Sequence, residues 1–225
     1  LNSINAGVGN LVAEGNKLQI KSVFWELTAL RMWIASIVCF GMYMLGDSFI
    51  IWWVGEEYIL PQSTFIVLIL ITFITLSRTN DVFLAAYGLY QDIWAPIVEA
   101  MLNLGLSILL GYYYGLTGIL SGVLISSLVI VYSWKPYFLY SQGFKISVLY
   151  YWMGYIKHLL IILLPAIVCY YLFPDNDFAA ESSFTHWIVY GAIIISTYGI
   201  FTCLLLYLFT PGIRAFAHRI LKRHH

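Results

Sequence analysis

Six long runs of apolar residues constrain the fold of this chain more than any other feature of its sequence. Each run has about 20 residues, the length that an α-helix needs to cross the hydrocarbon core of a bilayer. The runs are continuous and do not alternate with polar residues, which argues against the strands of an outer-membrane barrel. We therefore predict an all-α integral membrane protein with six transmembrane helices, at residues 27–45, 64–87, 94–113, 116–134, 156–173 and 187–209.

The composition supports lipid, and not water, as the solvent. Hydrophobic residues make up 61% of the 225 residues and charged residues only 10%, whereas soluble domains average about 45–50% and about 25%. The 11 basic and 11 acidic side chains leave no net charge. Such a chain has too few cations to bind a phosphate backbone, so membrane lipid is the expected partner and nucleic acid is not.

The basic residues are distributed unevenly, and this predicts an orientation. Ten of the eleven fall on one side of the six predicted spans: Lys17, Lys21, Arg31, Lys135, Lys145, Lys157, Arg214, Arg219, Lys222 and Arg223. The connections on the other side carry only acidic charges: Asp47, Glu56, Glu57, Asp175, Asp177 and Glu181. By the positive-inside rule, both termini of the chain are expected in the cytoplasm.

Motifs for catalysis and for metal binding are absent from the sequence. It contains no phosphate-binding Gly-Lys-Thr loop, no dinucleotide-binding glycine pattern, no Gly-x-Ser-x-Gly and no His-Glu-x-x-His. The three cysteines lie singly in apolar runs, and the histidines are scattered over different segments. We therefore expect no enzyme, no metal site and no cofactor.

Two ionisable residues lie inside the second predicted span. Arg78 is about 12 residues from the turn at the cytoplasmic end of this span, or about 18 Å at 1.5 Å per residue, and is therefore expected near the middle of the bilayer. Charged side chains at this depth are costly and usually face a cavity or a partner. Asp81 is three residues further along the same helical face, which makes it a candidate partner. Both are candidates for a substrate or ion pathway, although a purely structural ion pair explains them as well.

The third predicted span carries a second row of polar residues. Glu99, Asn103 and Ser107 are four residues apart and share one helical face. If the second and third spans form an antiparallel hairpin, Asp81 is level with Asn103, and Ala85 is level with Glu99. We expect the two rows to meet, and we add Glu99 and Asn103 to the pathway candidates. Exposure of Glu99 at the interface and an interhelical hydrogen bond of Asn103 are the structural alternatives.

A stripe of small residues marks the fourth predicted span. Gly118, Gly122 and Ser126 are four residues apart, a pattern that lets another helix approach closely. We predict a helix-packing face, which in a rocking transporter would also serve as a sliding surface.

A series of short motifs follows one another along residues 7–145. In order they are Gly9-Asn10-Leu11, Phe24-Trp25-Glu26-Leu27, Trp53-Val54-Gly55-Glu56-Glu57-Tyr58, Ala86-Tyr87-Gly88, Trp94-Ala95-Pro96, Leu102-Asn103-Leu104, Gly115-Leu116-Thr117-Gly118 and Lys135-Pro136-Tyr137. Their order and spacing resemble those of bacterial O-antigen and capsule repeat-unit flippases, members of the multidrug/oligosaccharidyl-lipid/polysaccharide exporter superfamily.

The resemblance implies a fold and a function. Proteins of that family have two helical bundles around a central cavity, alternate access between the two sides, and move undecaprenyl-diphosphate-linked glycans across the bacterial inner membrane for lipopolysaccharide and other surface polysaccharides. This chain would match only the C-terminal bundle, and its missing partner would be the N-terminal half of the same protein. The start at Leu1 and the resemblance of residues 2–13 to the tail of an earlier span also lead us to expect a fragment.

Together these features divide the chain into four segments. Residues 1–26 are expected to be a cytoplasmic lead-in, formed by the tail of an earlier span and an amphipathic helix. Residues 27–140 would form a four-helix membrane bundle, and residues 141–209 a cytoplasmic connection and, by the resemblance, two peripheral helices. Residues 210–225 form a basic cytoplasmic tail, which either lies on the anionic inner leaflet or merely stops translocation.

In the resulting hypothesis, Arg78 offsets the charge of the diphosphate in the cavity. Asp81, Glu99 and Asn103 would bind sugar hydroxyls or relay a coupling proton or sodium ion. Two alternatives remain open: a drug or cation antiporter of the same superfamily, and a membrane scaffold that transports nothing.

Overall fold

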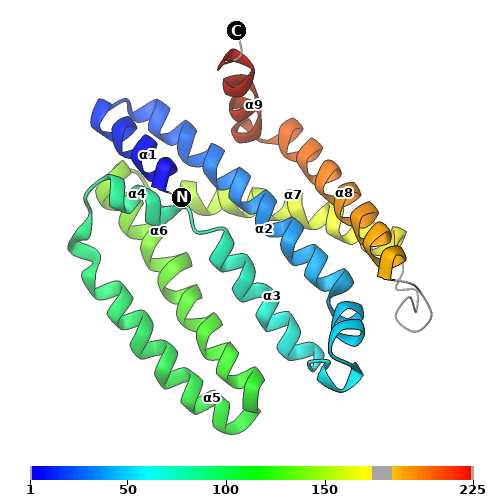
Figure 1. The fold of residues 1–225 in the computed structure, drawn as a ribbon. Helices are drawn as coiled ribbons and strands as arrows, with labels where there is room; N and C mark the ends of the chain where they lie inside the picture. Colours follow the sequence, from blue (N-terminus) through cyan, green and yellow to red (C-terminus); the bar gives the residue numbers. More distant parts are fainter. Residues whose placement is uncertain (1, 174–183, 224–225) are drawn as a thin grey trace.

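The computed structural model describes residues 2–173 and 184–223, and within these residues it contains helices and no β-strand (Figure 1). The main helices are α1 (Asn2–Glu14), α2 (Lys17–Trp53), α3 (Gln62–Leu76), α4 (Asn80–Ala86), α5 (Trp94–Ser127), α6 (Lys135–Phe138), α7 (Leu149–Leu172), α8 (Phe184–Phe209) and α9 (Pro211–Arg223). Short 3₁₀ turns η1 (Glu56–Tyr58) and η2 (Tyr90–Ile93) precede α3 and α5, and the π-helical segments η3 (Leu128–Trp134) and η4 (Leu139–Phe144) flank α6.

Five stretches of the described residues are long and apolar enough to cross a membrane, and one of them, Tyr90–Phe144, has 55 residues. This long stretch reverses direction at Gly115, which has φ +58° and ψ −135°. Figure 1 shows its two limbs side by side. We call residues 94–144 the α5 hairpin, with a first limb at 94–114 and a second limb at 116–144. The prediction of an all-α, multi-pass membrane protein is therefore confirmed, and the hairpin accounts for two of the six predicted spans.

The second predicted span is not continuous, contrary to the prediction of one helix over residues 64–87. α3 ends at Leu76 and α4 begins at Asn80. The intervening Ser77, Arg78 and Thr79, which we call the α3–α4 break, are followed by Asn80 and Asp81, so five polar residues stand in a row. Polar side chains of this kind compete with the helical backbone for hydrogen bonds; Ser77 Oγ, for example, donates to the Phe73 carbonyl at 2.7 Å.

α2 is the longest uninterrupted helix among the described residues. Its 37 residues correspond to about 55 Å at 1.5 Å per residue, well beyond the thickness of the hydrocarbon core. It starts after Gly15, which has φ +74°, and Asn16 caps it by accepting a hydrogen bond from the Gln19 amide at 3.2 Å. The boundary predicted at residue 26 therefore falls inside this helix.

α2 also contacts most of the other long helices. α3 and the α5 hairpin lie along one side of it in Figure 1 and α8 along the other, while α7 crosses behind it. The pair predicted to be peripheral, α7 and α8, shares the main core with α2 and contributes Tyr151, Tyr155 and Tyr198 to it. Phe24 of α2 is fully buried there, with its ring edge-on to Phe83 and other aromatic rings.

α9 packs against the first part of α2. A methyl group at Gly212 would lie 2.7 Å from the Trp25 carbonyl oxygen, which shows how closely the two backbones approach. Arg219 also pairs with the buried carboxylate of Glu26, at 3.0 Å. The predicted basic tail thus contains a helix docked on the protein itself.

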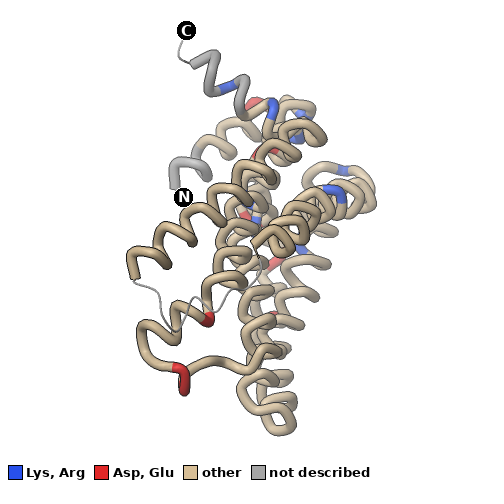
Figure 2. The backbone as a smooth tube through the Cα atoms, turned by 90° about the vertical axis from the view of Figure 1, so that its right-hand side faces the viewer, with Lys and Arg blue, Asp and Glu red and all other residues tan. Residues whose placement is uncertain are grey.

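Charged residues are segregated along the molecule. In Figure 2 the described Lys and Arg residues lie in its upper part, whereas the connection between α2 and α3 carries acidic residues alone. Asp175, Asp177 and Glu181, predicted for the same side as that connection, lie outside the described residues.

Candidate functional site

Arg78 lies at the centre of a group of charged side chains from several membrane helices. Its Nε atom is 3.3 Å from Asp81 Oδ2, and its Nη2 atom is 3.5 Å from Glu99 Oε1. The side chains of Arg78, Asp81 and Glu99 are 31%, 38% and 21% exposed. The structure therefore brings together three of the four predicted pathway residues.

Lys135 is a member of this group that the sequence analysis missed. Its Nζ atom is 2.7 Å from Asp81 Oδ1, and its side chain is only 12% exposed. The sequence analysis places it with nine other basic residues on the cytoplasmic side of the predicted spans. A hairpin at Gly115 could have indicated this position, because its two limbs run antiparallel. Contacts such as the hydrogen bond from Ser107 Oγ to the Ile119 carbonyl, at 2.9 Å, set the register of the limbs. Continued to the open end, that register brings Lys135 next to the start of the first limb.

Arg31 of α2 completes the group, because its Nη1 donates a hydrogen bond to the backbone carbonyl of Arg78. We call these five residues, Arg31, Arg78, Asp81, Glu99 and Lys135, the ion cluster. Three cations and two carboxylates leave it with one surplus positive charge. The buried Arg78 Nε atom has no hydrogen-bond partner among the described residues. Its 3.3 Å approach to Asp81 is thus an ion pair without an aligned hydrogen bond, and a donor remains unused.

Asn103, the fourth pathway candidate, has a different environment. It accepts a hydrogen bond from Ser107 Oγ at 3.1 Å, one turn further along the same limb. The two polar rows do meet, but not at the predicted levels, which set Asp81 beside Asn103 and Ala85 beside Glu99. Glu99 pairs with Arg78, a shift of seven residues relative to Ala85. The predicted levels assume one continuous helix over residues 64–87, whereas α3 ends at Leu76 and α4 begins at Asn80.

The α3–α4 break is held by a second set of polar contacts, which the sequence analysis did not identify. Ser77 Oγ and Tyr132 OH are 2.7 Å apart, and Tyr132 OH is hydrogen-bonded to Tyr155 OH. Asn80 Nδ2 donates to Tyr151 OH at 3.2 Å. Nothing in the sequence distinguishes these three tyrosines from the others in the chain, so only the fold shows their common partner.

The stripe of small residues packs as predicted, and its partner is the first limb of the same hairpin. Gly118, Gly122 and Ser126 are all buried. A methyl group at Gly122 would lie 2.5 Å from the Ser107 amide nitrogen, and one at Gly118 would overlap the Leu110 carbonyl. These residues therefore close the hairpin, whose first limb carries Glu99.

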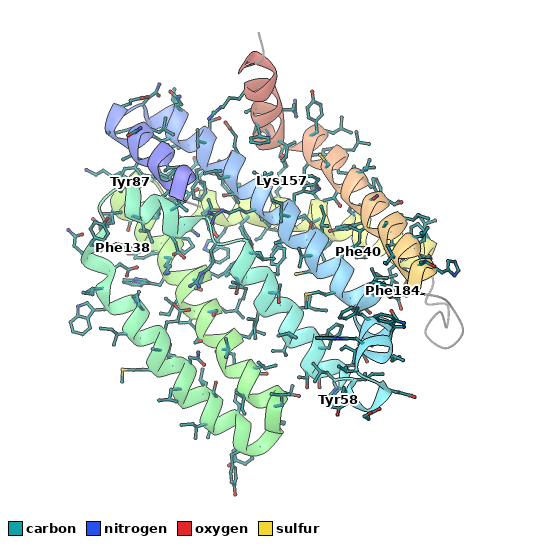
Figure 3. The ribbon with its side chains drawn as sticks, in the orientation of Figure 1. Phe40, Tyr58, Tyr87, Phe138, Lys157 and Phe184 are labelled. Atoms are coloured by element: carbon teal, nitrogen blue, oxygen red, sulfur yellow. The ribbon has the colours of Figure 1, made fainter. Side chains whose placement is uncertain are left out.

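Two cavities adjoin this part of the fold. One of about 380 Å³ is lined by Asp81 and Lys135 of the ion cluster and by residues of α4, η2 and the start of α5. Figure 3 shows Tyr87 and Phe138 at this end of the molecule. The other, of about 440 Å³, lies between α2, α3 and α7 and is lined mainly by apolar side chains, among them Phe40 (Figure 3), Phe73 and Leu163.

This arrangement can bind an anion at a position within membrane helices. Arginine and lysine side chains donate charge-assisted hydrogen bonds to phosphate oxygens, and such bonds are roughly twice as strong as neutral ones. Among the described residues, no group of three or more His, Cys, Asp or Glu side chains is placed to hold a metal ion. Comparison of the chain with protein-family models, with curated proteins and with solved structures finds no match.

Proposed function

We propose that this chain is part of a transporter that moves undecaprenyl-diphosphate-linked oligosaccharide repeat units across the bacterial inner membrane, for surface polysaccharide biosynthesis. The observation that carries the proposal is the ion cluster, with its surplus positive charge and its unused Arg78 donor. Isolated charges in membrane helices are costly, so a surplus cation there favours an anionic ligand. The motif order described above agrees with this substrate class.

Arg78 and Lys135 would bind the diphosphate by exchanging partners. Both side chains now contact Asp81, and Arg78 also contacts Glu99. When phosphate oxygens replace the carboxylates around the two cations, Asp81 and Glu99 lose their counter-charges. A proton or a sodium ion taken up by these carboxylates would restore the balance, which gives a route for coupling transport to an ion gradient. Asn103, one turn from Glu99, would bind sugar hydroxyls.

The hydrocarbon chain of the substrate needs an apolar surface close to the ion cluster. The apolar cavity of about 440 Å³ between α2, α3 and α7 offers one. Its lining residue Phe73 on α3 lies one turn before Ser77 of the α3–α4 break, and the next residue, Arg78, belongs to the ion cluster. A site for an anionic group next to a site for a hydrocarbon chain fits an amphiphilic substrate.

The ion cluster is one-sided, which supports a second bundle as partner. Roughly a third of the Arg78 and Asp81 side chains is exposed, at 31% and 38%. Charge facing hydrocarbon in this way is unfavourable, so we infer that the missing N-terminal half of the same protein covers this face and completes a cavity. Rocking of the two bundles would then open the cavity to either leaflet, with both termini of this chain in the cytoplasm.

The first test is the lipid that accumulates when the gene is removed. We expect cells without it to retain undecaprenyl-diphosphate-linked oligosaccharide in the inner leaflet and to lose the surface polysaccharide, because synthesis continues while translocation stops. Mass spectrometry of extracted lipids and surface labelling of the glycan measure the two effects. Tolerance to cationic drugs and dyes should stay within about twofold, since the surplus charge of the site is positive and repels cations.

Two other outcomes would contradict the proposal. Loss of drug tolerance without accumulation of lipid-linked glycan would indicate a drug or cation antiporter. A membrane scaffold would instead predict that the double substitution R78Q/D81N, which removes the central ion pair, leaves surface polysaccharide unchanged.

A further inference from the structure

We infer that two tyrosines of α7, Tyr151 and Tyr155, are positioning residues that hold the α3–α4 break and thereby place Arg78 in the ion cluster. The inference extends the proposed function, because it assigns a role at the substrate site to a helix outside the first four spans. It begins from the backbone at Arg78, which lies between two helices and belongs to neither.

The residues on either side of Arg78 are buried although the backbone at this point is irregular. Ser77, Thr79 and Asn80 are 5%, 2% and 5% exposed. Non-helical backbone at membrane depth is stable only where surrounding groups satisfy its polar atoms. Something must therefore fix the conformation of this segment, since a helical hydrogen-bond ladder does not.

Side chains from three other elements provide these contacts, on both sides of Arg78. Before it, Ser77 Oγ is 2.7 Å from Tyr132 OH of the second hairpin limb, and Tyr132 OH bonds to Tyr155 OH of α7. After it, Asn80 Nδ2 donates to Tyr151 OH of α7 at 3.2 Å. Arg31 of α2 binds the Arg78 carbonyl itself. Two of the three attachments thus lead to α7.

The two tyrosines are placed for this task by their spacing. Tyr151 and Tyr155 are one helical turn apart on α7, both are 3% exposed, and their rings stack with centroids 5.5 Å apart. Tyr151 OH contacts Asn80 directly, whereas Tyr155 OH reaches Ser77 through Tyr132 OH. Arg78 is then fixed where its guanidinium reaches both Asp81 and Glu99.

The test is the double substitution Tyr151→Phe/Tyr155→Phe in the intact protein, which removes both hydroxyl groups and keeps the rings. Its matched control is Tyr150→Phe/Tyr171→Phe, in which both altered tyrosines of α7 are exposed, at 66% and 77%. Backbone amide hydrogen exchange of the protein in lipid nanodiscs reports the break without requiring transport. We expect exchange at residues 77–80 to be about tenfold faster in the double variant, with no change in the α5 hairpin or in the control.

The second readout is the concentration dependence of transport of lipid-linked oligosaccharide in proteoliposomes. If the tyrosines position Arg78, the apparent KM rises about tenfold while the maximal rate changes less than twofold. Should the double variant fail to fold, Tyr155→Phe alone is expected to give about a threefold effect on both readouts.

Unchanged exchange at the break would overturn the inference, whatever happens to transport. Faster exchange with an unchanged KM would also overturn it, because α7 would then hold the break without placing Arg78. Failure of the proposed function is recognised separately, by a wild-type protein that moves no lipid-linked oligosaccharide while the exchange difference persists.

Discussion

Charge reversal at Arg78, in the variant R78E, is expected to abolish surface polysaccharide display while leaving the amount of protein in the membrane within about twofold of wild type. The substitution places a third carboxylate beside Asp81 and Glu99 and changes the ion cluster from one surplus positive charge to one surplus negative charge. A charge-assisted hydrogen bond contributes roughly 1.5–3 kcal/mol, and each 1.4 kcal/mol corresponds to a factor of ten. Loss of two such bonds to phosphate, with added repulsion, is expected to lower transport at least a hundredfold.

The charge-swapped variant R78E/E99R separates transport from a purely structural ion pair. It keeps one cation and one carboxylate facing each other between the break and the first hairpin limb, so folding and insertion should match those of wild type. The cation is now attached to a different helix, and transport should remain below about a tenth of wild type. Glycan surface labelling and immunoblotting of membranes measure the two quantities. Full display by R78E, or by the swapped variant, would show that Arg78 serves the fold and does not bind substrate.

The largest effect on stability is expected from alanine at the two glycines that close the α5 hairpin. A methyl group at Gly122 meets the Ser107 backbone at 2.5 Å, and one at Gly118 overlaps the Leu110 carbonyl. Backbone atoms cannot move aside as a flexible side chain does, so the limbs must separate. Overpacking of this kind costs about 1–3 kcal/mol or more, and in a chain of this size each 1 kcal/mol lowers the Tm by about 2–4 °C.

We therefore expect G118A and G122A to lower the Tm of the purified protein in detergent by about 5–10 °C each. G105A is the matched control, because a methyl group at Gly105 of the same hairpin meets nothing within 4 Å. Its Tm should equal that of wild type or exceed it slightly, since alanine favours a helix more than glycine does. A Tm of G122A within 1 °C of wild type would contradict the close packing of the two limbs.

The parts of this structure that the sequence predicted are those that depend on local spacing. Apolar runs of fixed length predict the membrane helices, the separation of Arg78 and Asp81 by three residues predicts their pairing, and the four-residue interval of Gly118 and Gly122 predicts a packing face. Each of these inferences uses only helical geometry within one segment. The contacts agree with the fold, although Arg78 lies in the α3–α4 break and not in the helix that was assumed for its pair with Asp81.

Contacts between different segments were harder to predict from the sequence, because they depend on where each helix ends. The five polar residues from Ser77 to Asp81 interrupt a helix that hydropathy alone would continue. The observed partner of Glu99, Arg78, is seven residues from Ala85, which a continuous helix would place beside it. The contact of Lys135 with Asp81 depends on the fold of the α5 hairpin. The tyrosine contacts to the break depend in turn on how α7 crosses α2, a packing arrangement that no periodicity in the chain encodes.

The uninterrupted length of α2 has a mechanical consequence. Near its first turns Glu26 is joined to Arg219 of α9, in its middle Arg31 holds the Arg78 carbonyl, and near its last turn the Trp52 ring stacks on Phe184 of α8, with centroids 4.0 Å apart. A rod of about 55 Å acts as a lever: tilted about one end by one degree, it moves the other end by about 1 Å. A rotation of a few degrees about the docked α9 would therefore displace the opposite aromatic end by several ångströms. The fluorescence of Trp52 would report that motion from the far side of the membrane.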